Sequence, residues 1–167
     1  MPKSRIKILN HTQIQQKIDR MAYQIWEDCF EEKELVIAGI ASRGYVLAER
    51  LKSVLEKISK IKVKLVRITL NKEIDHLDAE TDVPVEKCRN KVIIVVDDVL
   101  NSGRTLGYGL GVFLNIPTRK VRTAVLVDRS HKLFPISTDF AGLTVSTVSQ
   151  EHISVEFGKK EDSVYLS

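Results

Sequence analysis

The feature that most constrains the fold is an unbroken apolar run that ends in two acidic residues. Residues 92–96 read Val-Ile-Ile-Val-Val, and Asp97 and Asp98 follow directly. A run of β-branched residues like this predicts a strand buried on both faces, as strands are at the centre of a parallel sheet. The run therefore predicts an α/β fold with two carboxylates at the carboxyl end of its central strand.

Helical and strand-like patterns alternate around this run. Apolar residues recur at intervals of three and four where helices are predicted, at residues 13–32, 45–58 and 106–114. Further strands are predicted at residues 35–40, 63–70 and 121–127. The second of these strands carries interleaved basic residues and is expected nearer the sheet edge than the centre. The order predicts a mostly parallel, twisted sheet that is flanked by helices.

Composition and length fit one soluble domain that covers residues 1–167. The net charge of +4 suits anionic small ligands without demanding them. Cys29 and Cys88 form no CxxC pair, which argues against structural zinc and fits a reducing cytoplasm. No apolar stretch has the length of a signal peptide or a membrane span. We therefore expect a cytoplasmic protein without a membrane partner.

Two stretches lack a clear period. Residues 71–90 are polar and mostly acidic, and a loop of this length is typical of an active-site lid, with a disordered surface excursion as the alternative. After Asp128 the chain is irregular and suggests a small C-terminal unit over residues 128–167. Short β pieces are expected there near Phe140 and at residues 146–148, 153–157 and 164–166.

The turn after the two acids suits a sugar phosphate. Residues 101–105 read Asn-Ser-Gly-Arg-Thr and precede a predicted helix, whose N-terminus favours an anion. Gly103 permits a backbone geometry that a side chain would obstruct, and Ser102 and Thr105 add hydroxyl donors. Asp97 and Asp98 repel phosphate but accept from hydroxyl groups or hold a cation, and ribose supplies two neighbouring hydroxyls.

Two other phosphate motifs fit this segment less well. A Walker loop requires Gly where Asp98 stands and Lys where Arg104 stands. Gly107, Gly109 and Gly111 lie inside the predicted helix rather than at its start, so they do not form a dinucleotide fingerprint. We expect these glycines to let the helix pack closely on the sheet.

The segment of residues 92–105 resembles the signature of type I phosphoribosyltransferases, which binds phosphoribosyl pyrophosphate (PRPP). The closer resemblance is to the family of bifunctional pyrimidine operon attenuators and uracil phosphoribosyltransferases. It covers nearly the whole chain and includes the stretches 8–9, 20–22, 36–40, 42–44, 47–51 and 124–136. It implies the type I phosphoribosyltransferase fold, with a lid at about residues 71–90 and a hood at about residues 128–167.

The resemblance also implies a role for each matching residue. Asp97, Asp98 and Arg43 would be catalytic. The 5′-phosphate would be bound by Asn101, Ser102, Gly103, Arg104 and Thr105. Pyrophosphate would be bound by Ser42, Arg43 and Gly44, and the base by Arg129, His131 and Ile136. Magnesium would be the cofactor, held with PRPP near Asp97 and Asp98, with Asp128 as a further ligand. A homodimer or a dimer of dimers is implied.

The implied reaction transfers ribose 5-phosphate from PRPP to a nucleobase, with uracil favoured. A purine phosphoribosyltransferase and an RNA-binding regulator that senses nucleotides are the alternatives. The family binds RNA through a basic surface, but this chain has Gln16, Asp19 and Asp28 on the opening helix, and Leu143 and Val148 where the family commonly has lysine. Lost cations weaken nucleic-acid binding, so the sequence argues against RNA as a partner.

Overall fold

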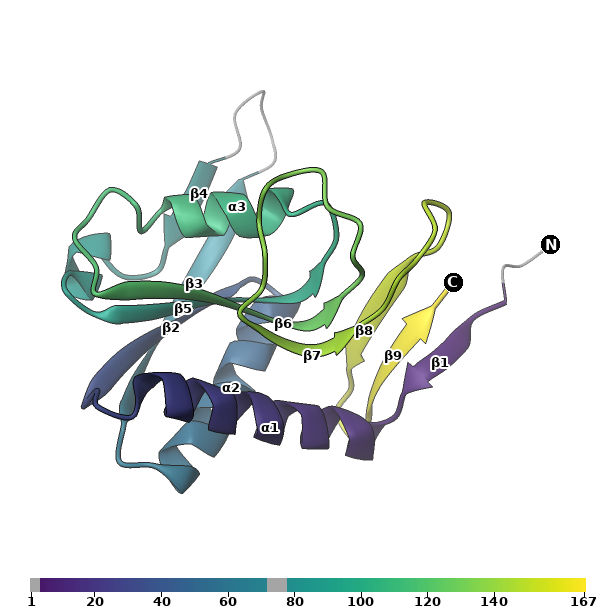
Figure 1. Cartoon of the computed structure of the whole chain (residues 1–167), viewed down its shortest axis with the longest axis horizontal. Coiled ribbons are helices and arrows are strands. Elements are labelled where there is room, and N and C mark those ends of the chain that lie inside the picture. The colour runs from purple at the N-terminus through teal and green to yellow at the C-terminus, as the bar shows by residue number, and fades with distance from the viewer. Residues whose placement is uncertain (1–3, 72–77) are drawn as a thin grey trace.

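The computed structural model describes residues 4–71 and 78–167, and a six-stranded sheet forms its centre (Figure 1). Its strands lie in the order β4-β3-β2-β5-β6-β7. Their bounds are β2 Glu34–Ile40, β3 Lys62–Asn71, β4 Asp78–Thr81, β5 Val92–Leu100, β6 Lys120–Asp128 and β7 Phe140–Thr144. Every neighbouring pair is parallel except β3 with β4. The predicted, mostly parallel α/β sheet is therefore confirmed.

Strand β5 is the buried central strand that its sequence predicts. All of its residues are buried, and it lies between β2 and β6. Successive side chains point to opposite faces of the sheet, as a strand requires. Ile94 and Val96 belong to the apolar layer under the first two helices, whereas Ile93 and Val95 belong to the layer under the third. Burial on both faces explains why this run lacks polar alternation.

Helices cover both faces of the sheet (Figure 1). The helices α1 (His11–Cys29) and α2 (Arg43–Ile58) lie on one face, and α3 (Arg104–Gly111) lies on the other. Helix α1 begins at His11 because Asn10 caps it. The Asn10 side chain accepts from the Gln13 N–H, and the Gln13 side chain accepts from the Asn10 N–H, both at 2.9 Å.

A second, smaller sheet joins the two ends of the described chain. It contains β1 (Ile6–Leu9), β9 (Asp162–Leu166) and β8 (Ile153–Phe157) in that order, all antiparallel. Strand β1 is absent from the expectations drawn from sequence. Within the predicted hood at residues 128–167, β7 belongs to the main sheet, whereas β8 and β9 form the small sheet with β1 from the other end of the chain.

The predicted loop at residues 71–90 contains regular structure. Strand β4 pairs with β3 from Ile68 to Asn71, and a 3₁₀ helix, η1, spans Val85–Cys88. The lid prediction also includes residues 72–77, which lie outside the described residues. At residues 146–148 the expected β piece is wrong, since this stretch forms an irregular connection between β7 and β8.

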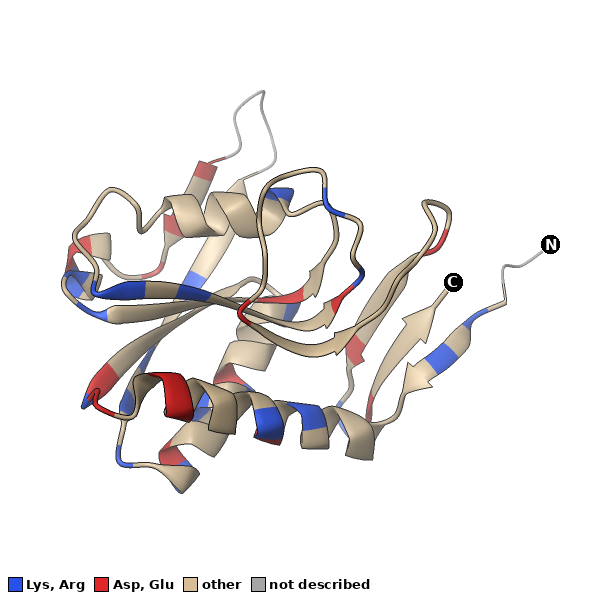
Figure 2. Cartoon of the chain, viewed as in Figure 1, with Lys and Arg blue, Asp and Glu red and all other residues tan. Residues whose placement is uncertain are grey.

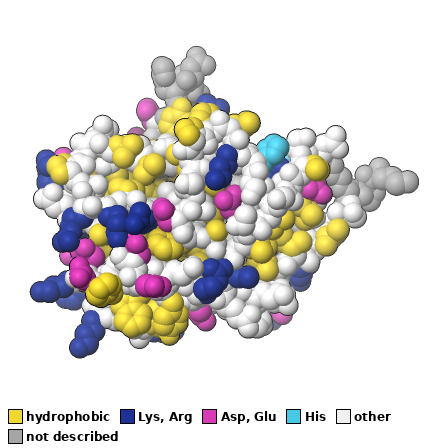
Figure 3. All heavy atoms as spheres, in the orientation of Figure 1, with side chains coloured by type: hydrophobic (Ala, Val, Ile, Leu, Met, Phe, Trp, Pro, Cys, Tyr) yellow, Lys and Arg dark blue, Asp and Glu magenta, His cyan; other side chains and the backbone are white. Residues whose placement is uncertain are grey.

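The surface over the C-terminal half of α1 carries exposed aromatic side chains (Figure 3). Tyr23, Trp26 and Phe30 are 53%, 36% and 68% exposed, and the rings of Tyr23 and Trp26 lie 6.2 Å apart. These side chains form a small exposed apolar group, which by itself identifies no partner. Among the described helices, none is long and apolar enough to cross a membrane.

Candidate functional site

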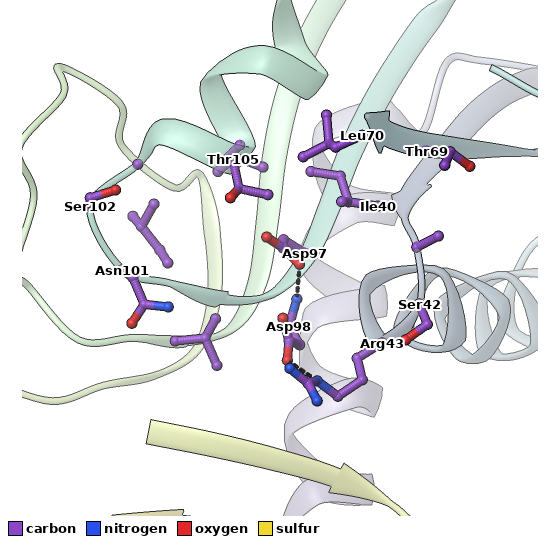
Figure 4. Close-up of a pocket in the computed structure, with 15 residues that line it drawn as sticks. Ile40, Ser42, Arg43, Thr69, Leu70, Asp97, Asp98, Asn101, Ser102 and Thr105 are labelled. Atoms are coloured by element: carbon purple, nitrogen blue, oxygen red, sulfur yellow. Dashed lines mark hydrogen bonds and ion pairs between the residues drawn. The ribbon is translucent and has the colours of Figure 1, made fainter. Parts of the chain in front are cut away.

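A cleft of about 390 Å³ opens at the carboxyl ends of β2, β3 and β5 (Figure 4). It is lined by residues 40–43, 69–70, 97–103 and 105–106. Strand ends and helix N-termini meet at this edge, which is where ligands collect in open α/β sheets. The cleft therefore brings together both segments that the sequence assigns to a sugar phosphate and its pyrophosphate.

Two adjacent carboxylates form the floor of the cleft. Asp97 and Asp98 are only 8% and 9% exposed, and one Asp97 oxygen accepts from the Asp98 backbone N–H at 2.8 Å. Burial raises the pKa of Asp97 well above its ordinary value, and the neighbouring charge of Asp98 raises it further. The pair is thus ready to accept from hydroxyl donors or to hold a cation, because either would stabilise the charged form.

Arg43 bridges the two walls of the cleft. It stands in the first turn of α2, and its Nε donates to Asp98 Oδ2 at 2.8 Å (Figure 4). Its side chain is 59% exposed, so the guanidinium also faces solvent where an anion can approach. The Ser42 side chain does not cap α2, which leaves the helix N-terminus available to an anionic ligand.

Gly44 explains how α2 can begin so close to β5. A β-carbon at this position would come within 2.8 Å of the Val96 carbonyl oxygen and 2.9 Å of Asp97 Cα. Both atoms belong to the backbone and have little freedom to move. The residue type at Gly44 therefore fixes the short distance between the two walls, a role that differs from direct contact with pyrophosphate.

The second anion-binding segment is the turn that joins β5 to α3. Gly103 has a φ of 90°, which favours glycine, and α3 starts at the next residue. The connection after β6 holds this turn in place, because the Ser102 carbonyl accepts from the backbone N–H groups of Leu133 and Phe134. Ser102, Gly103 and Thr105 line the cleft, whereas the exposed Arg104 does not.

The residues expected to bind the nucleobase lie behind or beside this turn. Ile136 packs against it, since a β-carbon added at Gly103 would lie 3.3 Å from Ile136 Cβ. Arg129 is 6% exposed and donates to the side chains of Thr147 and Asn101 and to the Val148 carbonyl. His131 is half-buried in the same connection. None of the three lines the cleft itself.

Sequence reasoning missed part of the cleft wall. Ile40, Thr69 and Leu70 line it from the ends of β2 and β3. Their position at the carboxyl ends of parallel strands was the available signal, because neighbouring strand ends meet at one edge of a sheet. Of the glycines in α3, Gly109 packs closely as expected, with Ile40 Cδ1 2.9 Å from an added β-carbon, whereas Gly111 meets nothing within 4 Å.

The carboxylates of the cleft floor are the kind of ligand that magnesium requires. Mg²⁺ prefers oxygen ligands and is usually bound by one or two carboxylates together with substrate phosphates. Asp97 and Asp98 supply such a pair, and no cluster of three or more metal-ligating side chains occurs in residues 4–71 and 78–167. Asp128 does not line the cleft, and its carboxylate accepts from the Ser130 N–H at 2.9 Å. The fit is thus to a metal that arrives with a phosphorylated ligand.

Comparison with known sequences gives one consistent result. The family model described as "Phosphoribosyl transferase domain" matches residues 4–162. A "Bifunctional protein PyrR" of Clostridium acetobutylicum is 34% identical over 170 residues, covering 96% of each chain. One from Staphylococcus epidermidis is 35% identical over 167 residues, covering 93% of each.

Solved structures agree on the fold. The hypoxanthine phosphoribosyltransferase of Trypanosoma cruzi superposes with a TM-score of 0.77, covering 95% of this chain and 94% of that one at 15% identity. A hypoxanthine-guanine phosphoribosyltransferase of Bacillus anthracis gives a TM-score of 0.67, covering 84% and 82% at 21% identity. At these identities the likeness concerns the arrangement of elements alone.

Proposed function

The chain belongs to the phosphoribosyltransferase family, and from that premise we propose that it transfers ribose 5-phosphate from PRPP to a nucleobase, with uracil as the favoured acceptor. The observation that carries the proposal is the meeting of three features in one cleft. A buried carboxylate pair lies between two helix N-termini, one at Ser42 and one at Gly103. A sugar with a phosphate at one end and a pyrophosphate at the other requires such a spatial arrangement of binding groups.

Each part of PRPP has a matching part of the cleft. The 5′-phosphate suits the turn at residues 101–105, where hydroxyls and a helix start face an anion. The ribose hydroxyls suit Asp97 and Asp98, which can only accept when ionised. Pyrophosphate suits Ser42 and the residues after it at the start of α2.

The reaction needs no protein nucleophile. The bond between the anomeric carbon and pyrophosphate breaks with its electron pair going to pyrophosphate. A base nitrogen supplies the pair for the new bond, and the proton of that nitrogen passes to water. Positive charge develops on the ribose in between, where Asp97 and Asp98 stabilise it. Arg43 can meet the departing charge with its terminal nitrogens while its Nε keeps the 2.8 Å bond to Asp98.

Magnesium belongs to this proposal as the cofactor. When bound with PRPP, it would offset the negative charge of the pyrophosphate. Asp97 and Asp98 are the side chains of the cleft that would hold it, directly or through water. The lid that the resemblance implies at about residues 71–90 would exclude water from the cleft and so protect the sugar cation from hydrolysis.

The base and the assembly state are the finer parts of the proposal. We propose Ile136 and the backbone around His131 as the wall of the base site, next to the turn that Ile136 contacts. A homodimer or dimer of dimers is proposed from the resemblance alone, and a cytoplasmic location is proposed from the cysteine usage of the sequence. Light scattering of the purified protein measures the mass in solution, and a monomer at all concentrations would contradict the assembly.

A base panel tests the function directly. The protein is incubated with PRPP, magnesium and each of uracil, hypoxanthine, guanine and adenine, and pyrophosphate release is followed. We expect release with uracil and formation of UMP. Turnover of guanine or hypoxanthine in place of uracil would establish the purine alternative. No pyrophosphate from any base would refute the transferase proposal.

A second candidate function is RNA-dependent regulation, which the word "bifunctional" in the relatives' name brings to mind. Several cations near α1 are already engaged within the protein. Arg20 donates to the Gly142 carbonyl at 2.6 Å, and Asp28 pairs with Lys120 and Arg122. Figure 2 shows α1 ending in acidic residues, which oppose a polyanion. A gel shift with pyrimidine-operon leader RNA and UMP tests this candidate, and we expect no shift.

A further inference from the structure

We propose that Arg129 is a positioning residue that turns the Asn101 amide toward the ligand, so that Asn101 rather than Arg129 contacts the nucleobase. The class of base that this arrangement selects is one with a carbonyl oxygen beside the ribose. The inference rests on the proposed function and deepens it. It replaces the base-reading role that the resemblance assigns to Arg129, and it gives Asn101 a role beyond the 5′-phosphate.

Each nitrogen of the Arg129 guanidinium donates a hydrogen bond within the protein. Its Nε donates to Thr147 Oγ1 at 2.9 Å and its Nη2 to the Val148 carbonyl at 3.2 Å. Its Nη1 donates to Asn101 Oδ1 at 3.4 Å. With 6% of its surface exposed and no place in the cleft lining, Arg129 cannot reach a ligand without breaking these bonds.

The bond to Asn101 determines which way its amide faces. A guanidinium carries donors only, so the atom it contacts must be the amide oxygen. The amide nitrogen then points away from Arg129. In Figure 4 this nitrogen lies on the side of Asp98, and Asn101 itself is exposed and lines the cleft. The rim therefore presents an N–H donor of fixed orientation.

The position of this donor suits a base. The 5′-phosphate would lie on the turn and the ribose hydroxyls at Asp97 and Asp98. The base is attached to the ribose carbon next to the one that carries the 2′-hydroxyl. Asn101 is the first residue of this turn, three positions after Asp98, and it is the amide among the cleft-lining side chains. Uracil carries its 2-carbonyl next to the nitrogen that joins the ribose, whereas hypoxanthine, guanine and adenine carry no carbonyl beside that nitrogen. A donor that the bound base covers and leaves without an acceptor disfavours binding.

Equilibrium binding separates the base contact from the phosphate contact. Isothermal titration of UMP, AMP and ribose 5-phosphate is carried out on the wild type, Asn101→Ala, Arg129→Gln and the double variant. We expect each single variant to weaken UMP about tenfold, with ribose 5-phosphate changed less than about threefold. The double variant should also lose about tenfold, because Arg129 acts through Asn101. AMP should bind more weakly than UMP to the wild type, and this difference should be absent in the variants.

Two further variants guard against loss of folding. Thr147→Val removes a partner of Arg129 without touching the cleft, and it should weaken UMP in the same direction by a smaller factor. Arg20→Gln is the matched control, since Arg20 also donates to backbone carbonyls but lies away from the cleft. It should leave both affinities unchanged.

Three results would overturn the inference. One is a multiplicative, about hundredfold loss in the double variant, which means that Arg129 contacts the base directly. Another is unchanged UMP affinity in Asn101→Ala. The third is a wild type that binds UMP no more tightly than ribose 5-phosphate. Absence of turnover in the base panel refutes the transferase proposal only, because this binding cycle requires no catalysis.

Discussion

At the scale of single residues, Asp97 is a group whose charge the free protein disfavours. Burial raises its pKa, and Asp98 opposes a second negative charge beside it. A ligand with hydroxyl donors or a cation reverses this balance by stabilising the ionised pair. Stability of the free protein and readiness for a ligand therefore oppose each other at this position.

Replacing Asp97 with Asn should make this opposition measurable. The Asn amide keeps an oxygen that accepts from the Asp98 N–H but carries no charge. Asp97→Asn should therefore raise the Tm of the ligand-free protein by about 2–4 °C at pH 7. A raised folded-state pKa means that wild-type stability is present below about pH 4 and declines as pH rises toward that pKa. The Tm difference should thus widen above pH 4. Calorimetry in EDTA measures it, and a difference independent of pH would contradict the prediction.

Two glycines give a matched pair of substitutions. Gly44→Ala drives a β-carbon against the Val96 and Asp97 backbone, which should destabilise the protein by about 1–3 kcal/mol and weaken PRPP binding. Gly111→Ala meets nothing within 4 Å and should stabilise α3 by up to about 1 kcal/mol. Urea unfolding measures both. Equal effects of the two variants would show that the close approach of α2 to β5 is not what requires Gly44.

At the scale of elements, the C-terminal end of α1 depends on its ion pairs. A carboxylate there is disfavoured by the helix dipole, yet the pKa of Asp28 is lowered from 3.8 to about 2, mainly by its hydrogen bond from Arg122 and also by Lys120. Asp28 accepts from Arg122 at 3.1 and 3.2 Å and pairs with Lys120 at 2.8 Å. These contacts tie α1 to β6.

Asp28→Asn should therefore lower the free energy of unfolding by about 1–2 kcal/mol at pH 7, somewhat less than the shift implies because water reaches the pair. A lowered folded-state pKa means that this stability is present above about pH 4 and is lost as pH falls toward 2. The variant should lack that acid-dependent loss. Urea unfolding from pH 2 to pH 7 measures it, with Glu31→Gln as the exposed control expected to change little.

Most elements follow from local patterns because their cause is local. The buried faces of α1, α2 and β5 appear as periods of 3.6 or as an unbroken apolar run. Strand β1 has no such signal, since its four residues gain their partner from β9 at the far end of the chain. Strand β4 is acidic and reads as loop, and it becomes a strand only because β3 offers a free edge.

The site shows the same division. The turn at Gly103 and the pair at Asp97 are contiguous in sequence, so their chemistry can be predicted from residue types alone. The contact of Arg43 with Asp98 and that of Arg129 with Thr147 join segments brought together by the fold. Nothing in the local sequence indicates these partners, which is why the placement of Arg129 away from the cleft lining could not be foreseen.

At the scale of the whole molecule, one buried carboxylate fastens the small sheet to the main domain. Asp162 in β9 has a side chain only 1% exposed, and it accepts from Arg50 of α2, with Nη2 to Oδ1 at 3.0 Å. Gln15 of α1 donates to it at 3.2 Å, and the Asp162 N–H donates to His11 Nδ1 at 3.1 Å. Both helices and the small sheet thus converge on this group.

Arg50→Gln should be strongly destabilising because it leaves the Asp162 carboxylate buried without its cation, at a cost of about 3 kcal/mol or more. Adding Asp162→Asn should recover part of that loss, since the two residues are coupled. Arg5→Gln is the control on the same sheet, where the exposed pair with Glu156 is worth less than about 1 kcal/mol. Urea unfolding compares the variants. Equal losses at Arg5 and Arg50 would refute the anchoring role.

The pairing of β1 with β9 has a consequence for the order of folding. Ile6 meets Leu166 across nearly the whole length of the sequence, whereas the pairs of β2 with β3 and of β2 with β5 join residues much nearer in sequence, such as Glu34 with Lys62 and Val36 with Ile93. Closing so long a loop is entropically unfavourable until the intervening chain is compact. The small sheet should therefore form after the rate-limiting barrier. Substitutions at Leu9 or Val164 would then accelerate unfolding and leave the refolding rate nearly unchanged.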